Sequence, residues 1–237
     1  MDIDLQHAHA FDVSTAEALA IQQDLARKVI RDNRIGVPSL IAGIEVMHVR
    51  ARGVVAAACV ILRWPGLERV GKAVADRVVR FPPVRDMSAF AELPVVLHVL
   101  GQAGSRPDLI LMGTPGIAHG RGLGPASHLG VLLGIPTISC GGDGHLGHHL
   151  PVPPLAGSES ALLHHGEVVG KVLRTRSRVQ PVVVTPGHGV DVPSSVQWVR
   201  TLLRGHRLPE PNHQAATLLK DARALWSAHA NGASGGS

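Results

Sequence analysis

Two glycine-rich loops carry most of the side chains in this sequence that are suited to proton transfer. The first loop spans residues 113–124 and the second spans residues 141–149. Their ionisable side chains are His119, Arg121, Asp143, His145, His148 and His149. Imidazole groups exchange protons near neutral pH, and a carboxylate can serve as their partner. The loops therefore indicate general acid–base catalysis, with the Arg121 guanidinium available to hold an anionic group.

Two other interpretations of the second loop stay open. Histidines in a glycine-rich loop are commonly solvated surface residues, and His145, His148 and His149 fit that description. A metal site made from two of these histidines and a glutamate is the second alternative, because imidazole and carboxylate are common ligands of divalent metals. The loop alone does not decide between these readings and acid–base catalysis.

Strands must position the loops, and the hydrophobic pattern places a buried strand before each of them. The run LILM at 109–112 precedes the first loop, and residues 136–140 precede the second. Further strands are expected at 40–46, 54–62, 70–79, 168–174 and 181–185. Short links join the first three of these strands, which predicts an antiparallel meander.

Helices are expected between and around these strands. Residues 14–32 begin with a capping box, in which Ser14 or Thr15 is followed by Glu17. The other expected helices cover residues 89–101, 125–133, 194–204 and 218–229. Antiparallel strands followed by β-α-β alternation predict an α/β fold, a mixed sheet with helices on both faces. Sites in such sheets gather at the carboxyl ends of strands, where both glycine-rich loops lie.

The composition limits the classes of partner. The net charge of +5 comes mostly from arginine, which favours bidentate recognition of phosphate, sulfate or carboxylate, although a GC-rich genome would give the same bias. Aromatic residues make up 3% of the chain and tyrosine is absent, which disfavours base stacking. The chain has neither a long apolar run nor a signal-peptide pattern, so we expect no membrane contact and a cytoplasmic location. Cys59 lies in an apolar run and is expected to be a buried thiol.

Six blocks of the sequence resemble endonuclease V in content and in order. They are IAGIEV (41–46), FPP followed by FAELP (81–94), PDLILMGTPGIAHGRGLGPASHLG (107–130), GIPTISC (134–140), TPGHGVDVPSSVQWV (185–199) and RLPEP (207–211). The resemblance implies a ribonuclease-H-like sheet. We expect a single domain, residues 1–230, followed by a flexible tail, residues 231–237, because the tail is rich in glycine and serine. It also implies a magnesium-dependent nuclease that cuts near deoxyinosine or near inosine in RNA.

Several positions depart from the pattern of that family. The departures are Glu45 for the first aspartate, Gly113 for the central aspartate, Ala216 for an Asp or His, Pro83 for the tyrosine of a strand-parting wedge, and residues 141–143 for a lysine. Glu92 keeps the helix carboxylate of the family. Losing one transition-state stabiliser commonly lowers a rate by about a hundredfold. A tight two-metal clamp is therefore hard to build from the residues that are left.

Our leading hypothesis from the sequence is a repurposed enzyme of secondary metabolism. It would act on a small anionic substrate by an intramolecular displacement that loses an anion such as sulfate, as in aziridine formation for an antibiotic. The predicted catalytic residues are Glu45, Glu92, His119, Asp143 and His145, and the predicted substrate-binding residues are Arg121, Pro83, Gly113 and Thr114. Either glutamate would be the base, and His119 or Arg121 would hold the leaving anion. No cofactor is expected.

Two alternatives come from other functional classes. One is a metal-dependent endonuclease V on inosine-containing nucleic acid, with Mg²⁺ held by Glu45 and Glu92. Carboxylates that converge on Mg²⁺ would activate water and neutralise phosphate charge. The other is a non-catalytic relative that binds nucleic acid or protein. A small companion subunit is also expected as a partner, and nucleic acid is the less favoured partner.

Overall fold

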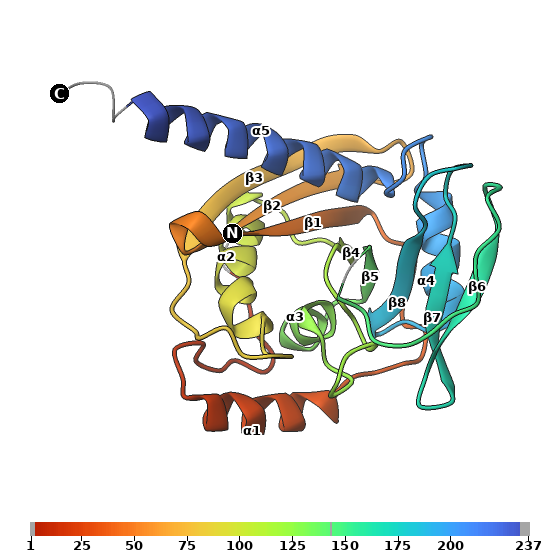
Figure 1. The fold of residues 1–237 in the computed structure, drawn as a ribbon, viewed down its shortest axis with the longest axis horizontal. Coiled ribbons are helices and arrows are strands. Elements are labelled where there is room, and N and C mark those ends of the chain that lie inside the picture. Colours follow the sequence, from red (N-terminus) through yellow and green to blue (C-terminus); the bar gives the residue numbers. More distant parts are fainter. Residues whose placement is uncertain (1–2, 143, 233–237) are drawn as a thin grey trace.

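The computed structural model describes residues 3–142 and 144–232, and they form one eight-stranded sheet in the order β3-β2-β1-β4-β5-β8-β7-β6 (Figure 1). The strands are β1 (Leu40–Val49), β2 (Val54–Arg63), β3 (Glu68–Val78), β4 (Leu109–Met112), β5 (Thr137–Gly141), β6 (Glu159–His164), β7 (Glu167–Leu173) and β8 (Val182–His188). β1, β4 and β5 run parallel, and the other neighbours are antiparallel. The predicted meander is therefore confirmed as β1–β2–β3, and a 3₁₀ turn (Arg50–Arg52) links its first two strands.

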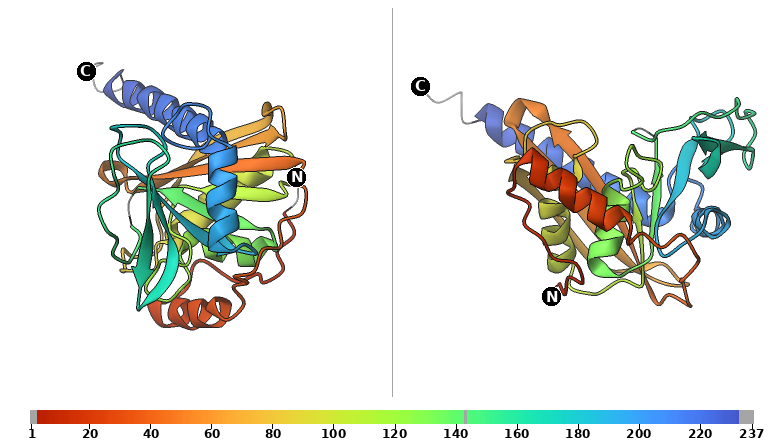
Figure 2. Two further views of the ribbon diagram at one scale, coloured as in Figure 1. Left: turned by 90° about the vertical axis from the view of Figure 1, so that its right-hand side faces the viewer. Right: turned by 90° about the horizontal axis from the view of Figure 1, so that it is seen from below.

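Helices cover both faces of the sheet, as the sequence predicts (Figures 1 and 2). The helices are α1 (Thr15–Ala26), α2 (Ala89–Gln102), α3 (Pro125–Leu133), α4 (Val192–Thr201) and α5 (Glu210–Gly232). Leu93 and Val96 of α2 share a buried cluster with Ile44 of β1, together with side chains of α3. On the other face, α5 packs on β1 and β2, and α4 packs on β8. This places the middle of the sheet between two helical layers.

Three elements differ from the sequence prediction because long-range contacts decide them. α1 ends at Ala26, since the chain after it pairs with the end of β8: the Ile30 N–H donates to His188 Nδ1 at 3.3 Å, and the Gly189 N–H donates to the Ile30 carbonyl at 2.7 Å. β6 was not predicted, and it is an edge strand whose neighbouring strand in the sheet is β7. α5 begins at Glu210, within RLPEP, rather than at Leu218.

The end of the chain is described only in part. The last two described residues, 231 and 232, belong to α5, and residues 233–237 of the predicted tail lie outside the described residues. Within the described part of the chain, none of the helices has the length and apolarity needed to cross a bilayer. Cys59 is fully buried and unbonded to another cysteine, as expected, and so is Cys140.

A close approach between α5 and β1 shapes the centre of the molecule. A Cβ on Gly43 would lie 2.1 Å from the Pro211 carbonyl carbon, so only glycine allows the first turn of α5 to rest on the strand. The contact brings Asn212 over the carboxyl half of β1. The carboxyl ends of the three parallel strands β1, β4 and β5 meet at the same edge, which is where the candidate site lies.

Candidate functional site

Glu45 fills the space that a side chain at position 113 would need. Ile44 of β1 pairs with Met112 of β4. The next residues along the chain, Glu45 and Gly113, therefore lie at the same edge of the sheet. A Cβ on Gly113 would lie 2.3 Å from Glu45 Oε2 and 2.7 Å from its carboxyl carbon. An aspartate at 113 is therefore incompatible with this position of the glutamate. The acid at 45 therefore keeps a carboxylate at the strand ends, next to the glycine at 113.

Asn212 holds the Glu45 carboxylate. Its Nδ2 donates to Glu45 Oε1 at 2.8 Å and also approaches the Leu111 carbonyl at 3.3 Å. Burial raises the pKa of Glu45 to about 7, and the Asn212 hydrogen bond and the Arg207 charge act in the opposite direction. The sequence analysis missed Asn212, although its position directly after the RLPEP block was a signal that could have found it.

Glu92 is the second acid of the site, and His48 orients it. Glu92 lies in the first turn of α2 with a side chain that is 6% exposed, and its Oε1 is 2.9 Å from His48 Nε2. The hydrogen bond to Glu92 raises the pKa of His48 above its usual value, against a smaller effect of burial. The buried Glu92 Oε2 has no hydrogen-bond partner among the described residues. His48 was also missed from the sequence, because nothing in its strand marks it as the partner of a helix residue.

The first glycine-rich loop brings His119 next to Asp86. His119 is buried, and its Nε2 lies 3.9 Å from Asp86 Oδ1. Burial lowers the pKa of His119, while the Asp86 charge acts to raise it. Its Nδ1 is buried and finds no partner within the described chain. The predicted role of His119 in holding an anion stays a prediction; the structure favours a neutral imidazole there.

Arg121 already has protein partners. Its Nε donates to Gln22 Oε1 at 2.8 Å, and its Nη2 donates to the Asp86 carbonyl at 2.9 Å. Gln22 Nε2 donates to the same carbonyl at 2.8 Å. These bonds tie the loop of Arg121 to α1 and to the segment before α2. The substrate-binding role predicted for Arg121 is untested, and the contacts give it a structural role.

The histidines of the second glycine-rich loop separate from each other. His145 Nε2 is 2.8 Å from Ser139 Oγ at the end of β5, which places this residue at the site edge. His148 pairs through its backbone with Leu163 of β6, and the exposed His149 contacts only the neighbouring Leu150 carbonyl through Nδ1 at 2.8 Å. Asp143, a predicted catalytic residue, lies outside the described residues.

The remaining predicted residues lie at two places. Thr114 follows Gly113, and its carbonyl accepts from Ser139 Oγ at 2.6 Å, while its own buried Oγ1 lacks a partner in the described structure. Pro83 lines a cavity of about 810 Å³ that also contains His48 and Arg85. Pro83 therefore faces space beside the Glu92–His48 pair, as a residue that contacts substrate would.

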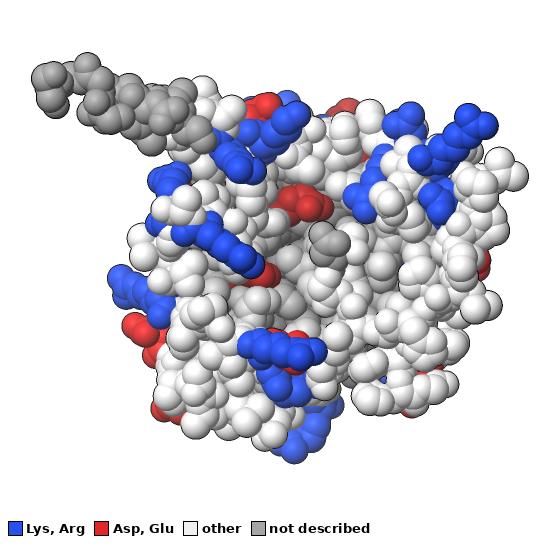
Figure 3. Space-filling view, in the orientation of Figure 1, with Lys and Arg blue, Asp and Glu red and all other residues white. Residues whose placement is uncertain are grey.

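The donor set of the described residues does not form a closed metal centre, and a hydrated cation completed by substrate is the kind of metal site that two acids could support. Among residues 3–142 and 144–232, no three His, Cys, Asp or Glu side chains form a group that could hold a metal ion. Mg²⁺, however, usually keeps several waters and binds one or two carboxylates together with substrate phosphates. The unpartnered Glu92 Oε2 and the carboxylate of Glu45 match that requirement. Figure 3 shows acidic side chains in a hollow near the centre of this face, with Lys and Arg side chains around it.

Comparison with known proteins gives one consistent result. The family model described as Endonuclease V matches residues 23–217. The curated Endonuclease V of Gloeobacter violaceus is 39% identical over 227 residues, which cover 91% of this chain and 90% of that protein. The resemblance inferred from the six blocks is confirmed.

These relatives overturn the leading hypothesis from the sequence. Relatives that match over nine-tenths of this chain are named for nuclease activity, and their names do not point to a small-molecule cyclase, to aziridine formation or to antibiotic biosynthesis. The sequence interpretation considered Gly113 by itself, whereas in the structure the Glu45 carboxylate occupies the space beside it. The nuclease alternative fits the comparisons better.

Solved structures agree in fold. The Endonuclease V of Streptomyces avermitilis superposes with a TM-score of 0.82 at 36% identity, covering 92% of this chain and 95% of that one. An Endonuclease V of Ciona intestinalis, crystallised with a 24mer DNA containing an inosine, has a TM-score of 0.74 at 22% identity and covers 89% of this chain and 98% of that one; it supports the fold alone. The predicted ribonuclease-H-like α/β fold is therefore confirmed, and the protein belongs to the endonuclease V family.

Proposed function

We propose that the protein is a metal-dependent endonuclease acting on inosine-containing nucleic acid, with a single-metal site that is weaker than a full carboxylate cluster. The observation that carries the proposal is the position of Glu45. Its carboxylate occupies the space of a side chain at 113, so the strand ends keep an acid although the central aspartate is absent. The relatives named Endonuclease V supply the reaction class, and the DNA complex of the Ciona protein suggests the substrate to test.

Glu45 and Glu92 would hold the divalent cation. When bound, such a cation activates a water and neutralises charge on the phosphate. Asn212 fixes the orientation of Glu45, and His48 takes one oxygen of Glu92 and leaves the other unpartnered. The hydrogen bonds therefore orient one acid of β1, through Asn212 of α5, and one acid of α2, through His48. Orientation by a second layer of hydrogen bonds is a general requirement of metal-binding carboxylates.

Cleavage is expected to be slow. The glycine at 113 and the alanine at 216 remove two groups that the family pattern places near the metal, and removal of one stabilising group commonly lowers a rate by about a hundredfold. Glu45 must also be ionised to bind a cation, and burial holds its pKa near 7. Activity should therefore increase as the pH is raised through neutrality.

The test is a cleavage assay on an oligonucleotide with one deoxyinosine, in Mg²⁺ or Mn²⁺ and in EDTA. The same oligonucleotide with deoxyguanosine at that position is the substrate control. The variants Glu45→Gln and Glu92→Gln remove one negative charge each and keep the shape of the side chain. We expect metal-dependent cutting by the wild type near the inosine, and loss of cutting in both variants.

A second candidate function has an observation of its own. The described residues contain no group of three metal ligands, which favours a relative that binds nucleic acid without cutting it. In one outcome, the wild type binds the inosine oligonucleotide in a salt-sensitive way and leaves it intact with both metals up to pH 9. That result would overturn the nuclease proposal and support binding without cleavage. Cutting that is equal in EDTA would point to a contaminating nuclease and would also reject the proposal.

A further inference from the structure

Two neighbouring cavities lie beside α2. The cavity of about 810 Å³ lies between the β1–β2 turn and the segment 81–85, and a cavity of about 430 Å³ lies between the end of β3, α2 and the segment of Phe11. Both are lined by Phe81 and Ala91, so they share part of a wall. We call the two cavities together the β3–α2 groove.

The groove begins at the candidate site. His48 lines the larger cavity and at the same time contacts Glu92 at 2.9 Å. Ala91, which lines both cavities, is the residue directly before Glu92 in α2. A strand that lies with one phosphate at Glu92 can therefore continue into the groove without leaving the surface.

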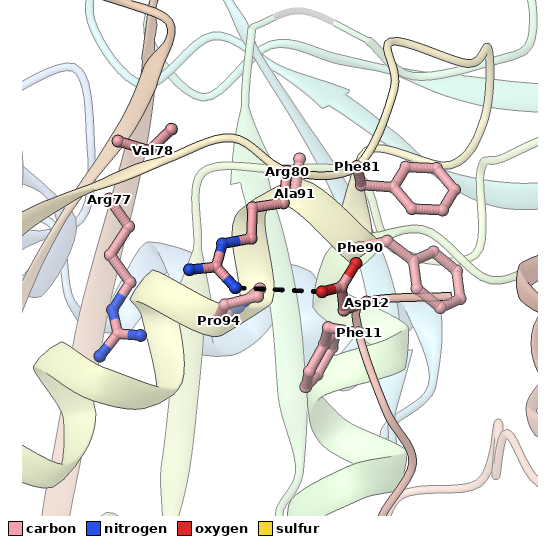
Figure 4. A pocket seen from close by; sticks show the side chains of 9 residues that line it. All are labelled: Phe11, Asp12, Arg77, Val78, Arg80, Phe81, Phe90, Ala91 and Pro94. Atoms are coloured by element: carbon pink, nitrogen blue, oxygen red, sulfur yellow. Dashed lines mark ion pairs between the residues drawn. The ribbon is translucent and has the colours of Figure 1, made fainter. Parts of the chain in front are cut away.

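The walls of the groove are basic. Arg50 and Arg85 line the larger cavity, and Arg77 and Arg80 line the smaller one. The acidic residue in the described lining is Asp12, which lies 3.9 Å from Arg80 in an exposed ion pair. Arg77 is exposed, and no described carboxylate lies within ion-pair distance of it. Figure 4 shows the Arg77 and Arg80 guanidinium groups on the same side of the cavity, with Arg80 directed toward Asp12.

The floor of the groove is apolar but offers little for base stacking. Phe81 and Phe90 are 5% and 2% exposed, and their rings stack on each other with centroids 5.1 Å apart. Buried rings that already pack together are not free to receive a nucleotide base. The available contacts are therefore guanidinium groups, which bind phosphate and carry no base specificity by themselves.

We propose that the β3–α2 groove binds the phosphodiester backbone of the nucleic-acid strand that leaves the site, and that Arg77 and Arg80 each contact one phosphate. The inference rests on the proposed function for its partner class. The groove would bind the backbone on one side of the inosine, whatever the base sequence there. Longer substrates on that side gain affinity through the groove, and substrates that end near the inosine do not.

The experiment measures binding in EDTA, so that no cutting is needed. Fluorescein-labelled single strands carry one deoxyinosine and tails of different length on its 5′ or 3′ side. Arg77→Gln/Arg80→Gln is compared with Arg63→Gln/Arg69→Gln, which removes the same two charges from exposed positions at the opposite end of the β2–β3 hairpin. Arg77→Lys/Arg80→Lys keeps the charges. Thermal unfolding of all variants checks that each is folded.

We expect the slope of log Kd against log salt to fall by about 1.4 in Arg77→Gln/Arg80→Gln, since each phosphate contact on a single strand contributes about 0.7. The control pair and the lysine variant should keep the wild-type slope. A longer tail on one side of the deoxyinosine should raise the affinity of the wild type but not that of the glutamine variant. A longer tail on the other side should have the same effect on both proteins. This pattern in a protein that never cuts would support the groove while the nuclease proposal fails.

Three results would overturn the groove. Equal slopes for Arg77→Gln/Arg80→Gln and wild type would show that no phosphate is bound there. Equal losses in the groove and control pairs would show a general charge effect. If the wild type binds none of these strands, nucleic acid is not the partner of the groove. The first two results leave metal-dependent cutting by the wild type untouched, so they separate failure of the groove from failure of the proposed function.

Discussion

The two acids of the site are held in different ways. Glu45 extends from a strand, is oriented by the neutral amide of Asn212, and stands in space vacated at position 113. Glu92 extends from a helix and is oriented by His48, a group that titrates near neutral pH. We call the Glu45 side, where Glu45 and Gly113 both differ from the family pattern, the rebuilt corner, and the Glu92 side, which keeps the family residue, the retained corner. The two corners should therefore respond differently to substitution and to pH.

The largest expected effect comes from reversing the rebuilt corner. Gly113→Asp alone places a Cβ against the Glu45 carboxylate, so that carboxylate must move away, and the variant should not improve cutting. Glu45→Asp/Gly113→Asp shortens the first acid and adds the second, and it should raise metal-dependent cleavage by about a hundredfold. Single-turnover rates and thermal unfolding of both variants measure this. A single variant that is as active as the double variant would disprove the coupling.

The next effect concerns the pH dependence of stability in EDTA. The folded pKa of Glu45, about 7, lies above its ordinary value of 4.5, so the folded state retains a proton that the unfolded state releases. Between pH 4.5 and 7 the contribution of this group to stability therefore falls as the pH rises. Comparing urea unfolding of wild type and Glu45→Gln should reveal a difference that grows by about 2 kcal/mol across that window, after a discount for partial exposure. Parallel curves would show that Glu45 titrates normally.

Asn212→Leu tests what holds the rebuilt corner. Leucine has a similar size but donates no hydrogen bond, so Glu45 loses its donor and its ionised form becomes less favourable. We expect a loss of about 1–2 kcal/mol at pH 8, which shrinks at pH 5, where the carboxyl is protonated. The pH at half-maximal cleavage should rise at the same time. A variant that is equally destabilised at both pH values would assign Asn212 to packing alone.

The sequence predicted the frame of the site better than its contacts. LILM before Gly113 and the strand before residue 141 were placed correctly, because buried strands and glycine loops leave local patterns. Asn212 and His48 were missed, since each meets its acid across a large separation in sequence. The loss of the aspartate at 113 was interpreted one position at a time. The contact between position 113 and Glu45 depends on the pairing of β1 with β4, which the separate positions do not reveal.

The smallest expected effect belongs to the retained corner, at His48. The hydrogen bond to Glu92 holds the pKa of His48 above 6.5, so the stability it contributes is complete below pH 6.5 and is lost as the pH rises through the folded pKa. With 45% of the side chain exposed, the contribution should stay below about 1 kcal/mol.

NMR titration of the His48 imidazole should give a raised pKa in the wild type and a lower one in Glu92→Gln. Because the Asn212 amide does not titrate, only the Glu92 corner should lose an orienting charge, as the pH rises through the folded pKa of His48, whereas the Glu45 corner becomes ionised as the pH rises through about 7. An unchanged His48 pKa in Glu92→Gln would show that the two corners do not differ in this way.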